Sequence, residues 1–192
     1  MKKLERAEQL RVEVEACRKC GLCANAKKKV LGEGNLDASI FFIGEAPGRS
    51  EDEQGRPFVG SAGKLLDKLL LQANLLRNDV YIGNVVKCRP LGNRRPVREE
   101  LEACAPHLAE QLDIIQPKIL APMGNSALDS VLMRYGLPKA VIGKVHGKYF
   151  NINTSWGKAK IFPLYHPAAA IYNRKLLNYL EEDMRRLGEL IS

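Results

Sequence analysis

Short apolar runs separated by longer amphipathic segments dominate the pattern of hydrophobic and polar positions along this chain. The runs at residues 39–43, 79–86 and 118–122 are typical of buried strands. Two further strands are predicted at residues 148–152 and 160–164. Each run is short enough for a strand and is bounded by glycine, proline or polar residues, which argues against a buried helix.

Helical periodicity fills the segments between these strands. It predicts helices over residues 3–16, 61–74, 98–115 and about 173–190, with a short helix after Gly124-Asn125-Ser126. Ser61 is the expected N-cap of the second helix. Because strands and helices alternate, the sequence predicts a three-layer α/β/α fold around a central, mostly parallel sheet of four to five strands. At 192 residues and 45% apolar content, residues 1–192 are expected to form a single domain.

Three candidate functional loops follow predicted strands, at residues 44–60, 87–96 and 165–170. In open α/β sheets, ligands bind beyond the carboxyl ends of the strands. The first loop carries Glu45 on a turn whose glycines and proline impose an unusual backbone course, and Phe58 lies in its returning segment. We therefore expect a carboxylate and an aromatic ring to face one cavity.

Two polar residues stand beside these loops. Asn84 lies inside a predicted strand, where an amide is costly to bury unless its donors and acceptors find partners. Its carboxamide suits recognition of a nucleobase edge, although a bond to neighbouring backbone is the commoner arrangement for such a residue. His166 follows a strand and precedes a proline, and a lone loop histidine is more often structural than catalytic. His107 and His146 are interpreted as surface or packing residues.

Charge narrows the class of partner. The chain has 30 Lys and Arg against 22 Asp and Glu, a net charge of +8, which favours a polyanion such as nucleic acid, although a solvated basic surface explains the same count. No apolar stretch reaches the roughly 18 residues of a membrane span, and the N-terminal residues are too charged for a signal peptide. These features predict a cytoplasmic protein that does not enter a membrane.

Five cysteines, at positions 17, 20, 23, 88 and 104, favour metal or redox chemistry over disulfides in a cytosolic chain. Cys17-x-x-Cys20-x-x-Cys23 resembles the opening of a ferredoxin-type iron–sulfur run, which Cys88 and Cys104 could complete. Zinc is the rival, weakened by the 15 residues between Cys88 and Cys104, and unliganded buried thiols are a third interpretation. Four ligands suffice for a 4Fe-4S cluster, and spacing alone does not say which cysteine is spare.

These segments together resemble a known family. The cysteine set and four motifs, in order along the chain, are similar to the family 4 uracil-DNA glycosylases, the iron–sulfur group of the uracil glycosylase superfamily; the motifs are Gly44-Glu-Ala-Pro-Gly48, Gly55-Arg-Pro-Phe-Val-Gly60, Asn84-Val-Val-Lys-Cys-Arg-Pro90 and Tyr165-His-Pro167. The similarity runs from about Cys17 to Arg174. It implies a uracil glycosylase-like fold and a monofunctional DNA N-glycosylase, which releases uracil from DNA and leaves an abasic site for base excision repair.

The resemblance also implies a cofactor. One structural 4Fe-4S cluster is expected on Cys17, Cys20, Cys88 and Cys104, with Cys23 as the extra thiol. The cluster would tie the N-terminal cysteine-bearing segment to the rest of the domain and take no part in the chemistry.

Roles in the pocket follow from the same resemblance. Phe58 is expected to stack on a flipped-out uracil and Asn84 to read its edge. Glu45 corresponds to the acidic residue associated with the attacking water, and His166 to the histidine that hydrogen-bonds uracil O2. The turn residues Gly44, Ala46 and Gly48 are expected to line the uracil site, and Glu51 to lie near it and help exclude thymine.

The implied partner is uracil-containing DNA, single- or double-stranded, bound by a monomer. Arg89, Ala168, Arg174 and Lys175 are the candidate DNA contacts. Many relatives have His-Pro-Ser-Tyr where this chain has His-Pro-Ala-Ala-Ala, so Ala168 offers no hydroxyl to the backbone. No sliding-clamp motif is evident.

Two alternatives remain at this level. One is an enzyme of the same superfamily that acts on another damaged base, such as hypoxanthine. The other is a non-catalytic iron–sulfur or zinc protein that binds nucleic acid, which offers no reason for Glu45, Phe58, Asn84 and His166 to occur together.

Overall fold

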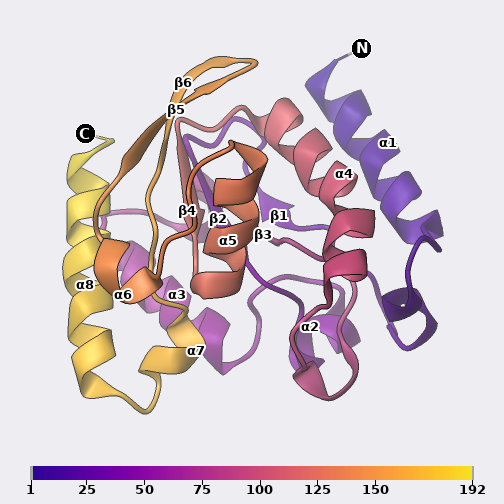
Figure 1. Ribbon diagram of the computed structural model, residues 1–192, viewed down its shortest axis with the longest axis horizontal. Coiled ribbons are helices and arrows are strands. Elements are labelled where there is room, and N and C mark those ends of the chain that lie inside the picture. The colour runs from indigo at the N-terminus through magenta and orange to yellow at the C-terminus, as the bar shows by residue number, and fades with distance from the viewer. Residues whose placement is uncertain (1, 192) are drawn as a thin grey trace.

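A mixed six-stranded sheet forms the centre of the computed structural model, which describes residues 2–191 (Figure 1). Its strand order is β1 (Glu33–Gly34), β3 (Tyr81–Asn84), β2 (Ile40–Gly44), β4 (Ile119–Pro122), β6 (Gly157–Ile161) and β5 (Phe150–Thr154). The four inner strands run parallel, whereas β1 and β5 pair antiparallel at the two edges.

The expected three-layer, mostly parallel α/β fold is therefore confirmed, but the prediction of four to five strands was wrong. The missed strand, β1, has only two residues and one of them is Gly34, so it carries no hydrophobic alternation. The strand predicted at residues 79–86 is shorter than expected and covers Tyr81–Asn84.

Successive residues of β2 serve opposite layers because side chains alternate across a strand. Phe41 and Ile43 pack into one hydrophobic cluster, and Ile40 and Phe42 into the other. The first cluster is covered by helices α1 (Lys3–Ala16), α4 (Arg98–Ile115) and α5 (Asn125–Arg134). The second is covered by α3 (Ser61–Gln72), α7 (Pro167–Ala170) and α8 (Arg174–Glu189), as Figure 1 shows.

The long helices lie where the periodicity placed them, and the short ones were missed. The latter are α2 (Arg49–Gln54), α6 (Ile142–Val145), α7 and the 3₁₀ turns η1 (Gly21–Ala24), η2 (Arg77–Asp79) and η3 (Leu91–Asn93). Each is too short to show a helical period. Within the part of the chain that the structure describes, no helix is long and apolar enough to cross a membrane.

Strand register brings the candidate loops to one edge of the sheet. Gly44, the last residue of β2, pairs with Asn84, the last residue of β3, and Ile43 pairs with Pro122 of β4. Strands β2, β3 and β4 therefore end nearly level, and the segments that follow them meet over the same edge.

The segment that leads into α3 is tightly packed against that helix. Phe58 has a φ of 51°, in the left-handed region that a bulky side chain rarely adopts. The helix starts at Ser61, and Gly60 rather than Ser61 is its N-cap, so that prediction was wrong. A Cβ on Gly63 would lie 1.8 Å from the carbonyl oxygen of Phe58, so only glycine lets the first turn of α3 come this close.

We expect Gly63→Ala to destabilise the protein, because relief of this clash must move either Phe58 or α3. Overpacking of this kind typically lowers the free energy of unfolding by about 1–3 kcal/mol. Without the clash, a change from glycine to alanine in a helix would raise the free energy of unfolding, because alanine has the higher helix propensity. Urea denaturation measures the difference. Gly21→Ala is the control, because a Cβ on Gly21 would have no neighbour within 4 Å. A Gly63→Ala variant at least as stable as the parent would contradict the close approach.

Candidate active site

A cavity of about 760 Å³ opens where β2, β3 and β4 end. Its walls come from the Gly44–Gly60 loop, the loop after β3, the start of α5 and the His166 segment. Glu45, Phe58, Asn84 and His166 all line it. The four side chains singled out in the sequence, more than 100 residues apart at the extremes, therefore share one cavity.

Asn84 forms part of the buried wall. Its side chain is 1% exposed, and its Oδ1 accepts no hydrogen bond from any residue between 2 and 191. Lys87 Nζ donates to the Asn84 carbonyl oxygen at 2.6 Å, which anchors the main chain of this residue. A buried acceptor without a partner costs about 1–3 kcal/mol, so this oxygen retains the capacity to accept a hydrogen bond from a ligand.

Gly44 makes room for this amide and for the ring of Phe58. A Cβ on Gly44 would lie 2.3 Å from Asn84 Oδ1 and 2.8 Å from the ζ carbon of Phe58. Both contacts are too short for any larger residue. The Phe58 side chain itself is 6% exposed and stacks on His166, with ring centroids 5.6 Å apart and an interplanar angle of 29°.

His166 is held as a neutral imidazole. Burial lowers its pKa, although the carboxylates of Glu45 and Glu51 act in the opposite direction. Its Nδ1 accepts the Ala168 N–H at 3.1 Å and so caps α7. With Nδ1 as an acceptor, the single ring proton sits on Nε2, which gives the imidazole one hydrogen bond to donate.

Glu45 is the most accessible of the four, with a side chain that is 26% exposed. Its Oε2 lies 3.6 Å from Arg95 Nε, in a loose ion pair with an arginine that is largely in solvent. The Glu45 carbonyl oxygen accepts the Val86 N–H at 3.1 Å, which fixes the turn to the chain after β3. A carboxylate at this position can meet both the cavity and incoming solvent.

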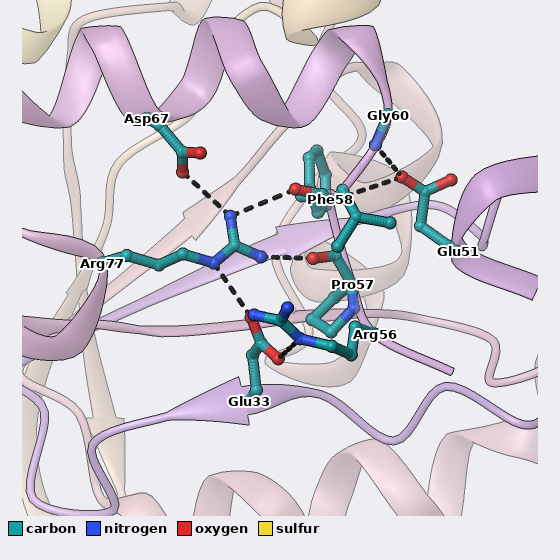
Figure 2. Close-up of polar contacts among 9 residues, drawn as sticks. Glu33, Glu51, Arg56, Pro57, Phe58, Gly60, Asp67 and Arg77 are labelled. Carbon is teal, nitrogen blue, oxygen red and sulfur yellow. Dashed lines mark hydrogen bonds and ion pairs between the residues drawn. The ribbon is translucent and has the colours of Figure 1, made fainter. Parts of the chain in front are cut away.

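Glu51 connects two walls of the cavity. Its Oε1 accepts the N–H groups of Val59 and Gly60, each at 2.9 Å (Figure 2). Its Oε2 accepts the N–H of Gly48 at 3.1 Å. The carboxylate thus ties the Gly44–Gly48 turn to the segment that carries Phe58. Ala46, Gly48 and Glu51 line the cavity as expected, but the N–H of Gly48 is already bonded to Glu51.

The expected DNA contacts lie at different distances from this cavity. Ala168 is exposed and lines it, whereas Arg174 and Lys175 are exposed at the start of α8 and do not. Arg89 donates from Nε to Asn93 Oδ1 at 2.7 Å. Arg94 and Arg95, which fall in the predicted loop at residues 87–96 but were not singled out there, also line the cavity. The position of their loop after a predicted strand was the signal that could have found them.

All five cysteines line a second, smaller cavity between α1, α4 and the end of β3. Cys88 and Cys104 are buried and the other three are partly buried, and no disulfide joins them in the described chain. Burial, together with the neighbouring Cys104 thiol, raises the pKa of Cys88 to about 12. His107, interpreted as a surface or packing residue, is 6% exposed and packs in this cavity.

The donor set of this cavity fits an iron–sulfur cluster. Thiolates are the ligands that such clusters require, and apolar residues including Val14 and Leu22 shield the site from water. Among residues 2–191, no three His, Cys, Asp or Glu side chains are gathered closely enough to hold a single metal ion. Since all five cysteines face the cavity, the arrangement does not single out the spare one.

Known proteins match the chain over nearly its whole length. The model of the uracil DNA glycosylase superfamily matches residues 31–188. The chain is 46% identical to a type-4 uracil-DNA glycosylase of Saccharolobus solfataricus, over 94% of this chain and 84% of that protein. It is 43% identical to one of Archaeoglobus fulgidus, over 97% and 94%, and 42% identical to one of Thermotoga maritima, over 93% and 91%.

A type-5 uracil-DNA glycosylase of Thermus thermophilus is more distant, at 33% identity over 64% of this chain. The resemblance drawn from the motifs is thus confirmed by the full-length similarity. The chain belongs to the uracil-DNA glycosylase superfamily and, within it, to the type-4 enzymes.

Proposed function

We propose that this protein is a uracil-DNA glycosylase that hydrolyses the N-glycosidic bond of deoxyuridine in DNA and leaves an abasic site. Its similarity to type-4 uracil-DNA glycosylases supports this activity. The observation that carries the proposal is the buried Asn84 Oδ1, which has no partner among the described residues and belongs to a residue that lines a cavity shared with Phe58 and His166. A non-catalytic DNA-binding protein would gain nothing from that arrangement.

Recognition begins when the base leaves the duplex, at a cost of a few kcal/mol that is lower for a mismatched base. In the pocket, Phe58 stacks on one face of uracil. Asn84 Oδ1 accepts the uracil N3–H, and its amide nitrogen donates to O4. Cytosine presents an acceptor at N3 and a donor at position 4, so the same carboxamide orientation opposes both of its groups.

Hydrolysis then separates charge. Electrons of the C1′–N1 bond move to uracil, positive charge develops on the sugar, and a water oxygen bonds to C1′. The Glu45 carboxylate orients that water, accepts the proton that the water loses as it bonds to C1′, and favours the positive sugar. His166 Nε2–H stabilises the negative uracil at O2. The Gly48 N–H is bonded to Glu51, so we assign any main-chain contribution to the other N–H groups of the Gly44–Gly48 turn.

We further propose that Cys17, Cys20, Cys88 and Cys104 hold one 4Fe-4S cluster and that Cys23 is the extra thiol. When bound, the cluster supplies a structural link and no chemistry of the reaction. The thiols would connect the N-terminal segment, the chain after β3 and helix α4, which makes residues 1–192 one domain.

Arg89, Arg174 and Lys175 are proposed to contact phosphates. The Ala168–Tyr172 segment, which is exposed at Ala168, Ala169 and Tyr172, is proposed to support the opened duplex. Glu51 is proposed to help exclude thymine indirectly, because its hydrogen bonds hold together the two walls of the cavity. That the protein is monomeric and cytoplasmic and acts on single- or double-stranded DNA stays a prediction.

We expect Asn84→Ala to slow uracil release about 100-fold, the equivalent of two lost hydrogen bonds of about 1.5 kcal/mol each. The assay is single-turnover cleavage of a uracil-containing oligonucleotide, followed by alkali to break the abasic site. Asn153→Ala is the matched control, since Asn153 is exposed on β5. Full activity of Asn84→Ala would remove the edge-reading role.

Glu45→Gln keeps the size of the side chain and removes its charge. We expect the single-turnover rate to fall by about 10²–10⁴-fold, while the affinity for uracil-containing DNA, measured by fluorescence anisotropy, changes little. Glu53→Gln makes the same change on exposed α2 and should leave the rate unaltered. Equal rates for Glu45→Gln and the parent protein would exclude a catalytic carboxylate here.

Metal analysis tests the cofactor. The purified protein should be brown and contain about four iron atoms per chain, the content of one 4Fe-4S cluster. We expect Cys88→Ser to lose iron, colour and thermal stability, and Cys23→Ser to keep all three. A colourless protein with stoichiometric zinc would refute the cluster, and iron loss in Cys23→Ser would refute the choice of ligands.

A further inference from the structure

We propose that Arg77, which lies outside the cavity, is a positioning residue that holds Phe58 in the conformation required for base stacking. This inference rests on the proposed function, because Phe58 needs its position only if it stacks on a base. Arg77 belongs to η2, between α3 and β3, in a segment with no motif and no hydrophobic period.

The guanidinium group of Arg77 binds two consecutive carbonyl groups of the Phe58 segment (Figure 2). Its Nη1 donates to the Phe58 oxygen at 3.1 Å, and its Nη2 donates to the Pro57 oxygen. Nη1 also lies 2.9 Å from Asp67 Oδ1, and Nε lies 2.9 Å from Glu33 Oε1. All three guanidinium nitrogens are therefore engaged, and the two carboxylates fix the plane of the group.

The same segment is held from its other side by Glu51. Figure 2 shows Arg77 and Glu51 on opposite sides of residues 57–60. Arg77 donates hydrogen bonds to the carbonyl groups of residues 57 and 58, whereas the Glu51 carboxylate accepts hydrogen bonds from the N–H groups of residues 59 and 60. Two charged side chains of opposite sign thus orient the three successive peptide groups that join residues 57 to 60.

Phe58 needs such support because its backbone is unfavourable. A φ of 51° places it in the left-handed region, which is unfavourable for a bulky residue and persists only where the surroundings hold it there. In the more common extended conformation, the ring would leave its place beside Gly44 and His166. Gly63 permits the conformation by lacking a Cβ, and Arg77 and Glu51 supply the attraction that maintains it.

Glu33 keeps Arg77 in place. Partial burial opposes ionisation of the Glu33 carboxyl, but hydrogen bonds from Arg56 and Arg77 outweigh it and lower its pKa. Glu33 is therefore a carboxylate at neutral pH. The Arg77 side chain is 20% exposed, and a lysine could offer its ammonium to only some of these four oxygen acceptors.

Arg56 provides a matched control. It pairs with the same carboxylate, from Nε to Glu33 Oε2 at 2.8 Å and from Nη2 to Oε1 at 3.0 Å. Its side chain is 58% exposed, and its recorded hydrogen bonds go to Glu33 and not to the carbonyl groups of residues 57 and 58. Arg56→Ala thus removes the same charge and the same Glu33 contact but leaves the Phe58 segment held.

A double-mutant cycle tests the proposal. Arg77→Ala, Phe58→Ala and the double variant are compared in single-turnover uracil release, well below the melting temperature of each. Base–aromatic stacking is worth about 1–3 kcal/mol, or roughly 5- to 150-fold in rate, and we expect Arg77→Ala to lose a substantial part of this, about 5- to 50-fold. In the Phe58→Ala background, removal of Arg77 should cost less than about twofold, because coupled residues are not additive.

Several results would overturn this role. These are a rate within about twofold of the parent for Arg77→Ala, losses that add fully in the double variant, or an equal loss in Arg56→Ala. If Arg77→Ala does not fold, Arg77→Lys takes its place in the cycle, because it retains the charge beside Glu33. A parent protein inactive on uracil-containing DNA would refute the proposed function itself, whereas an active parent with additive losses would refute only the role of Arg77.

Discussion

The absence of a side chain at Gly44 is the constraint on which the site depends. Parallel pairing sets Gly44 beside Asn84 at the ends of adjacent strands, so the amide and the Phe58 ring approach the same point from different elements. A Cβ there would lie 2.3 Å from Asn84 Oδ1, and even an alanine would push the amide away. The fold brings the Asn84 amide and the Phe58 ring together only because Gly44 has no side chain.

Strand positions and the loops that follow them could be predicted from the sequence, because each depends on local pattern. The run at Ile40–Ile43 is apolar because β2 is covered on both faces, and its abrupt end at Gly44-Glu45 marks the transition from core to site. Asn84 was ambiguous in the sequence. Its unpartnered oxygen became visible only once the neighbouring strand was in place.

Contacts between distant segments could not be predicted in this way. Arg77 reaches back 19 and 20 residues to the carbonyl groups of Phe58 and Pro57, from a turn that resembles any polar surface turn. Glu51 was interpreted as a pocket residue that excludes thymine, yet its oxygens are bonded to main-chain N–H groups. In both cases the residue type is ordinary, and the role comes from what the tertiary structure places opposite it.

The cysteine cavity and the active-site cavity share one short piece of chain. Asn84 ends β3 and lines the first cavity, and Cys88 lies four residues later and lines the second. Lys87 lies between them, 1% exposed, and donates to the Asn84 carbonyl oxygen and to Gln111 Oε1. A centre built on the cysteines would anchor this segment from one side while the sheet anchors it from the other.

Polar groups around the cavity bond to one another and leave a few atoms of Asn84 and His166 available for a ligand. Glu51 accepts the Val59 N–H and Arg77 donates to the Phe58 carbonyl oxygen. The Ala168 N–H donates to His166 Nδ1. The Asn84 Oδ1 acceptor and the His166 Nε2–H donor take no part in these bonds, and under the proposed function they would meet the N3–H and the O2 of uracil. Because the walls are bonded before a base arrives, we expect little ordering to oppose binding, and the His166 Nε2–H donor to meet the negative charge that develops on uracil without reorganising.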